Sequence, residues 1–115
     1  MDITISSHDN GRLTVVSIAG SLDVSGAAQI EVAMKEAVKK MCDIAVDMSG
    51  VTFLSSQGTR VLVITSKATS ANTRSLYLVG PNPLVRKALV IMGIDKIIPI
   101  FNSFEEVTVH RGGKG

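Results

Sequence analysis

The hydrophobic pattern of this chain switches repeatedly between a strand-like and a helix-like period, and this alternation limits the possible folds more than any other feature. Residues 3–7 and 13–19 alternate apolar and polar positions, which is typical of half-buried strands, and Asp9-Asn10-Gly11 between them is a strong turn signal. The chain therefore opens with a predicted β-hairpin. Beyond it, helix-like segments alternate with short apolar segments. Because strands separated by helices pair in parallel, the pattern predicts a single-domain α/β fold with helices packed on a mixed, mainly parallel sheet.

The boundaries of these segments follow from their turn and capping residues. We expect a loop over residues 20–24, with Ser25 as the N-cap of the first helix. Next we expect a helix over residues 27–41, a strand over 43–48 closed by Ser49-Gly50, and a helix from 58 to a stop at Asn72. A strand over 75–79, a helix from Pro83 to a stop at Gly93, a strand over 97–101 and a helical turn or short helix over 104–107 complete the pattern. Residues 1–109 then form the domain, and residues 110–115, where no apolar anchor is found, are expected to form a disordered tail.

The composition excludes several classes of function. The 115 residues are 45% hydrophobic with one Tyr, three Phe and no Trp, so the core must be aliphatic, and the aromatic platforms of single-strand nucleic-acid binders are missing. The formal net charge of +2 is too small to indicate a nucleic-acid or membrane partner. No apolar run reaches membrane-spanning length, and the start of the chain has no secretion-signal pattern. We therefore expect a cytoplasmic protein without membrane insertion.

Conventional catalysis and metal binding find little support among the titratable residues. Cys42 is the only cysteine, which excludes an internal disulfide and a cysteine-based zinc site, and its place at the start of an apolar strand predicts a buried structural thiol. His8 falls in a predicted turn and His110 at the start of the predicted tail. Asp23 and Asp47 are the best-placed carboxylates, and turn formation or capping explains both. We expect no enzyme activity, no metal and no cofactor; an enzyme on an α/β scaffold is the least favoured alternative.

The segment at residues 51–60 places a hydroxyl-rich turn between an apolar strand and a strongly apolar helix. A hydroxyl at such a junction lies beside unpaired N-terminal amides of the helix, where added negative charge is tolerated. This makes Ser56 a candidate regulatory phosphorylation site. Ser55 or Ser56 can equally be a plain N-cap of the helix, and the residues alone leave both interpretations open.

With these residues assembled, the chain resembles the anti-sigma-factor antagonists, the stand-alone bacterial members of the STAS domain superfamily. The resemblance extends over residues 3–107 and is carried by three segments. Ala19-Gly20-Ser21-Leu22-Asp23 is similar to the family's Gly-Glu-Leu-Asp loop after the second strand. The residues 46–53 are similar to its Asp-Leu-Ser-x-Val-x-Phe strand end, and residues 84–94, with Met92-Gly93-Ile94, to its third helix and the Gly-Leu stop. The order and spacing of the three segments make the resemblance specific.

This resemblance implies a switch between partners. Family members bind an anti-sigma factor that is also a serine kinase, which frees the sigma factor for transcription. The kinase ends the interaction by phosphorylating a serine in an Asp-Ser-Ser/Thr-Gly motif, and a metal-dependent phosphatase of the PP2C type restores it. The matching serine here is Ser56, with Gly58 as the motif glycine. The partner-binding residues that the resemblance implies are Asp23, Ser55, Ser56, Gln57, Gly58, Thr59 and Arg60.

The motif also departs from the family pattern. Ser55 stands where the family has aspartate, Gln57 replaces the second hydroxyl residue, and Thr59-Arg60 replaces Leu-Gly. Kinase recognition is therefore expected to be weakened, altered or lost, and Ser55 is an alternative phosphoacceptor. The altered motif keeps open a second function, that of a STAS subunit bound constitutively to the ATPase of an ABC transporter without phospho-switching. The oligomeric state is left open.

Overall fold

The computed structural model describes residues 1–112 and has one five-stranded sheet with the strand order β1-β2-β3-β4-β5. The strands are β1 (Asp2–His8), β2 (Leu13–Leu22), β3 (Asp43–Leu54), β4 (Leu76–Val79) and β5 (Ile100–Phe101). β1 and β2 pair antiparallel, and each later pair is parallel. The predicted hairpin and the mixed, mainly parallel sheet are confirmed.

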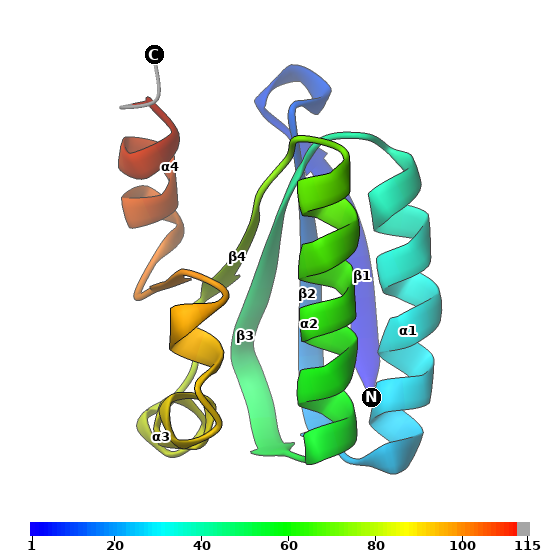
Figure 1. Cartoon of the computed structure of the whole chain (residues 1–115), viewed down its shortest axis with the longest axis vertical. Helices are drawn as coiled ribbons and strands as arrows, with labels where there is room; N and C mark the ends of the chain where they lie inside the picture. The colour runs from blue at the N-terminus through cyan, green and yellow to red at the C-terminus, as the bar shows by residue number, and fades with distance from the viewer. Residues whose placement is uncertain (113–115) are drawn as a thin grey trace.

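Helices lie on both faces of this sheet. They are α1 (Val24–Lys39), α2 (Ser56–Ala71), α3 (Pro83–Ile91) and α4 (Phe104–Gly112), with short 3-10 turns at Asp9–Gly11 and Ile94–Lys96. Figure 1 shows α1 and α2 running side by side across one face, with α3 beside the end of β3. No helix within residues 1–112 is long and apolar enough to cross a membrane.

The two faces bury cores of different size, because alternate residues of each strand point to opposite sides of the sheet. On β3, Ile44, Val46 and Met48 are fully buried in the larger core, which α1, α2 and α3 cover. The smaller core on the other face is covered by α4. It consists of Leu13, Val15, Ala45, Tyr77, Val79 and Val107.

Two strands extend further than their sequence predicts. β2 continues to Leu22, so the expected loop at residues 20–24 is wrong, and Asp23 rather than Ser25 caps α1. β3 continues through Ser49-Gly50 to Leu54. A Cβ at Gly50 would lie 2.7 Å from the Cβ of Ala19 on β2, so glycine lets the two strands stay paired here instead of ending one of them.

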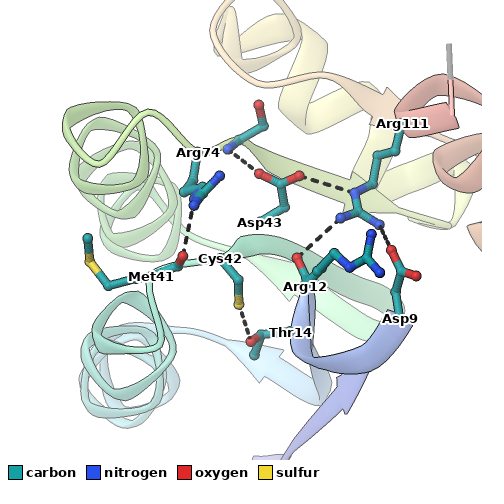
Figure 2. Close-up of polar contacts among 9 residues, drawn as sticks. Asp9, Arg12, Thr14, Met41, Cys42, Asp43, Arg74 and Arg111 are labelled. Atoms are coloured by element: carbon teal, nitrogen blue, oxygen red, sulfur yellow. Dashed lines mark hydrogen bonds and ion pairs between the residues drawn. The ribbon is translucent and has the colours of Figure 1, made fainter. Parts of the chain in front are cut away.

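The expected tail at residues 110–115 is wrong for its first three residues, because α4 continues to Gly112. Arg111 donates from Nε to Asp43 Oδ2 at 3.1 Å, from Nη1 to Asp9 Oδ2 at 3.2 Å, and from Nη2 to the Arg12 carbonyl at 3.1 Å, as Figure 2 shows. The end of α4 is therefore anchored by ionic hydrogen bonds and not by an apolar side chain. Residues 113–115 lie outside the described residues.

The positive charge of Arg111 is stabilised by two neighbouring carboxylates. Its side chain is only 16% exposed, and this burial by itself would lower the pKa of the guanidinium. The hydrogen bonds and negative charges of Asp43 and Asp9 outweigh burial, so the pKa of Arg111 is raised above its ordinary value. Arg111 thus stays cationic and ties α4 to the β1–β2 turn and the start of β3.

The remaining boundaries agree with the sequence apart from the last strand. Asn72 is the C-cap of α2, and Gly93, with a φ of 75°, follows the cap of α3. The strand expected over residues 97–101 is reduced to β5, because the amides of Ile97 and Ile98 still donate to the Ile94 carbonyl of the preceding 3-10 turn. Cys42 is buried, as predicted, with its Sγ 2.9 Å from Thr14 Oγ1.

Candidate functional site

The candidate site lies at the edge of the sheet where β2 and β3 end and α1 and α2 begin. Leu22 and Leu54 are paired across the two parallel strands, so the residues that follow them, Asp23 and Ser55, come to the same edge. These two residues are the N-caps of α1 and α2. The structure thus brings together the two sequence segments from which site residues were predicted, and Figure 1 shows both helices starting at this end of the sheet.

Asp23 fixes the start of α1. Its Oδ1 accepts a hydrogen bond from the Gly26 amide at 2.8 Å, which is the geometry of an N-cap. A Cβ at Gly26 would collide with the Ser21 carbonyl oxygen, so a glycine is required for the first turn of α1 to pack this closely on β2. The side chain of Asp23 is otherwise exposed, so its remaining carboxylate oxygen is accessible from solvent.

Both the side chain and the amide of Ser55 are hydrogen-bonded within the domain. Its Oγ accepts from the Gly58 amide at 3.2 Å and donates to the Leu22 carbonyl at 2.6 Å. Its own amide donates to the same carbonyl at 3.0 Å. Gly58 lets the helix approach β2, because a Cβ there would lie 2.5 Å from Leu22 Cδ2. Of the two serines, Ser55 is therefore the N-cap, and it fastens α2 to the end of β2.

Ser56, by contrast, is exposed at the first helical position of α2. Its Oγ makes one long hydrogen bond, at 3.3 Å, to the side chain of the adjacent Gln57. No acidic residue lies in the first turn of α2, so the partial positive charge of the helix N-terminus is not neutralised there. A negative group on the Ser56 hydroxyl would lie in a favourable field without removing a cap.

The side chains that follow Ser56 on α2 differ in exposure. Gln57 is exposed, whereas Thr59 is buried and donates from Oγ1 to the Ser56 carbonyl at 2.7 Å. Arg60 is exposed one turn further along and forms no ion pair with any residue between 1 and 112. Thr59 therefore supports the helix start from inside, and Gln57 and Arg60 are free to contact a partner.

The other residues considered from the sequence lie away from this site. Asp47 lies seven residues before the end of β3, paired with Ser17 on β2 and Val79 on β4. Its Oδ1 accepts from both the amide and the hydroxyl of Ser49. Turn formation and capping thus account for Asp47 and Asp23, as expected. His110 packs on α4 against the Tyr77 ring, with 5.6 Å between the ring centroids.

Sequence reasoning missed Asn82, which joins α3 to the same edge. Its Oδ1 accepts from the Val85 amide at 2.9 Å, capping α3, and its Nδ2 donates to the Val51 carbonyl on β3 at 3.0 Å. An asparagine directly before Pro83 at the first helical position is a capping signal that the sequence did contain. No local sequence signal indicates the hydrogen bond from Asn82 to Val51 on β3.

Comparison with known proteins agrees with this geometry. The sequence model of the STAS domain matches residues 4–107. A relative from Mycobacterium tuberculosis, named anti-sigma-F factor antagonist RsfB, is 31% identical over 114 residues, which cover 97% of this chain and 93% of the relative. Among solved structures, an anti-sigma factor antagonist from Mycobacterium paratuberculosis matches with a TM-score of 0.82 at 26% identity, covering 95% of this chain and 93% of that chain.

A more distant structure shares the fold. The Bacillus cell fate determinant SpoIIAA, solved in its phosphorylated form, has a TM-score of 0.69 at 18% identity and covers 93% of this chain and 97% of that chain. The family match spans nearly the whole chain, including both helix starts of the candidate site. This chain belongs to the STAS domain family.

Proposed function

We propose that this chain is an anti-sigma factor antagonist that works by switching partners. In its unmodified form it binds an anti-sigma factor with serine-kinase activity, which releases a sigma factor. Phosphorylation of Ser56 ends that interaction, and a phosphatase of the PP2C type restores it. The chain acts by binding and carries out no catalysis itself, and it works in the cytoplasm, where transcription takes place.

The observation that carries the proposal is the division of roles between two adjacent serines. Ser55 holds the helix start through three hydrogen bonds that join it to Leu22 and Gly58. Ser56 is exposed, and within residues 1–112 its hydroxyl bonds only to the side chain of the adjacent Gln57 and does not hold the helix start. A kinase can reach Ser56 without unfolding the cap, whereas a phosphate on Ser55 would displace both bonds of its Oγ. The geometry thus favours Ser56 over Ser55 as the phosphoacceptor.

Ser55 takes over the capping role of the aspartate that precedes the serine in the family motif. Ser55 replaces the acidic residue of the family motif and still supplies the oxygen that caps α2. The departure therefore removes one negative charge but keeps the helix start intact. This supports a phosphoacceptor that keeps its position and meets its kinase with altered electrostatics.

Phosphorylation changes the charge of this surface more than its shape. A phosphate adds about −1.5 to −2 charges and a strongly hydrated group. At the N-terminus of α2 it would not destabilise the domain, because anions are favoured there. Inside an interface the same group must lose its hydration and can meet like charge. A loss of about 3–4 kcal/mol of binding free energy corresponds to a two to three orders of magnitude weaker affinity.

The names of relatives support the assignment. The Mycobacterium tuberculosis relative is named an anti-sigma-F factor antagonist, and SpoIIAA, which shares the fold, exists in a phosphorylated form. We infer the same class of partner for this chain. The transporter-bound alternative gains no support from the exposed Ser56, because a constitutive subunit needs no accessible phosphoacceptor.

The experiment is a set of titrations against purified anti-sigma factors that carry a serine-kinase domain, taken one by one from the genome that encodes this chain. Wild type and Ser56→Ala should bind one of them with similar affinity, and Ser56→Asp should bind it at least a hundredfold more weakly. Ser70→Asp, an exposed serine near the other end of α2, is the matched charge control and should bind as wild type does. Equal affinity of wild type and Ser56→Asp, or no binding to any of these factors, would refute the proposal.

A further inference from the structure

The most exposed large hydrophobic side chains of the described residues lie on α3. Leu84 is 73% exposed and Ile91 is 74% exposed. The two residues are seven positions apart and therefore lie on the same side of the helix. Only Val85 and Leu89 of this helix are buried. Met92 and Ile97, which follow α3, are also exposed and extend the apolar surface.

The start of α3 is tied to the end of β3, the strand that leads to Ser56. The hydrogen bond from Asn82 to the Val51 carbonyl fixes the start of α3 to β3. Phe53 lies between that point and Ser56, and its ring is exposed. Figure 1 shows the end of β3 between α3 and the first turn of α2. Exposed apolar side chains thus lie both on α3 and on the last residues of β3 before the phosphoacceptor. We use the term α3 patch for Phe53, Leu84, Ile91, Met92 and Ile97.

The charged residues in the segments that carry the α3 patch are mostly positive. Residues 53–60 and 83–97 contain four cations, Arg60, Arg86, Lys87 and Lys96, and a single carboxylate, Asp95. Lys87 lies between Leu84 and Ile91 on the helix, and Lys96 precedes Ile97. Among residues 1–112, no ion pair involves Lys87, Lys96 or Arg60. Their charges are therefore available to a partner.

We propose that the α3 patch is a second part of the partner-binding surface and that it receives an apolar region of the anti-sigma factor bordered by carboxylates. This inference rests on the proposed function and names the chemistry of the partner. Apolar side chains clustered next to a switch site and bordered by unpaired cations complement such a surface in both shape and charge.

An acidic partner surface also explains how one phosphate can act as a switch. Carboxylates drawn to Arg60, one turn after Ser56 on α2, would lie close to the edge that carries Ser56. A phosphate on Ser56 would bring about two further negative charges against them. Repulsion and the cost of desolvating the phosphate then act together to separate the two proteins, while the domain itself remains folded.

The test uses the anti-sigma factor that binds the wild-type chain, and measures its affinity for variants of the α3 patch. Leu84→Ser and Ile91→Ser should each weaken binding at least fivefold, as expected for central interface residues. Val109→Ser on α4 is the matched control, because Val109 is 72% exposed but lies outside the patch, and it should bind as wild type does. Thermal unfolding of each variant verifies that the fold is retained.

Charge reversal tests the acidic character of the partner. Lys87→Glu should weaken binding more than Lys67→Glu, a reversal of an exposed lysine of α2, and the difference should shrink at high salt. If Ser56→Asp weakens binding but both serine variants of the patch bind as wild type does, the inference is overturned and the proposed function stands. If the patch variants alter self-association of the chain but not its affinity for the anti-sigma factor, the inference is also overturned. Failure of every anti-sigma factor to bind would overturn both.

Discussion

Replacing each of the two adjacent serines by alanine should have very different effects on stability. Ser55→Ala removes the N-cap of α2 and its bond to the end of β2, whereas Ser56→Ala removes one long, solvent-exposed contact with Gln57. We therefore expect Ser55→Ala to destabilise the domain clearly and Ser56→Ala to leave its stability almost unchanged.

The magnitude follows from the hydrogen bonds. Loss of the cap on the Gly58 amide should cost about 1 kcal/mol of unfolding free energy. Loss of the bond to the Leu22 carbonyl should add about 0.5–1 kcal/mol, at the lower end of the usual range, because that oxygen keeps the amide of residue 55 as a donor. The total of about 1.5–2 kcal/mol corresponds to a Tm lower by about 6–8 °C in a domain of this size. Ser56→Ala should stay within about 0.5 kcal/mol of wild type.

Urea unfolding followed by circular dichroism measures both values, provided that the m-value is unchanged between variants. Ser55→Thr serves as a further control, because it keeps the hydroxyl and should recover part of the loss. If Ser56→Ala proves as destabilising as Ser55→Ala, then Ser56 carries structure and the division of roles between the two serines is wrong. A neutral Ser55→Ala would contradict the reasoning equally.

Three further substitutions test other parts of the structure. Gly58→Ala should destabilise by about 1–3 kcal/mol in thermal unfolding, although alanine favours helices, because the new methyl group meets Leu22; a stabilised variant would contradict this packing. Arg111→Met should lower the free energy of unfolding by about 1–3 kcal/mol and increase amide hydrogen exchange in α4. A double-mutant cycle with Asp43→Asn should show coupling between the two residues. Independent effects of the two substitutions would mean that the ion pair does not anchor the helix. Asp23→Asn should preserve stability within about 0.5 kcal/mol, since asparagine caps as well as aspartate, so any loss in titrations with the anti-sigma factor then reports the charge itself.

The strand and helix pattern was predictable because it depends on local periodicity. The hairpin turn at Asp9-Asn10-Gly11, the helix stops at Asn72 and Gly93 and the helix start at Pro83 are short-range signals. The meeting of Asp23 with the Ser55–Gly58 turn also follows from the pattern, since adjacent parallel strands end at the same edge of a sheet. The sequence could therefore indicate both the fold and the position of the site.

Contacts between distant segments could not be predicted in this way. Whether Ser55 or Ser56 caps α2 depends on the carbonyl of Leu22, 33 residues earlier in the chain. The anchoring of Arg111 depends on Asp43 and Asp9, which lie 68 and 102 residues earlier. Local patterns contain no information about such partners. The continuation of β3 past Gly50 has the same origin, because it depends on the close approach of Ala19 on β2.

The central claim is that Ser56 is the switch, and phosphosite mapping of the chain purified from its own cells tests it most directly. Intact mass should show a single added phosphate under some growth condition, and fragmentation should place it on Ser56. The phosphate should disappear in Ser56→Ala but not in Ser70→Ala, the matched substitution near the other end of α2. A phosphate on Ser55, or an unmodified chain under all conditions, would contradict the account.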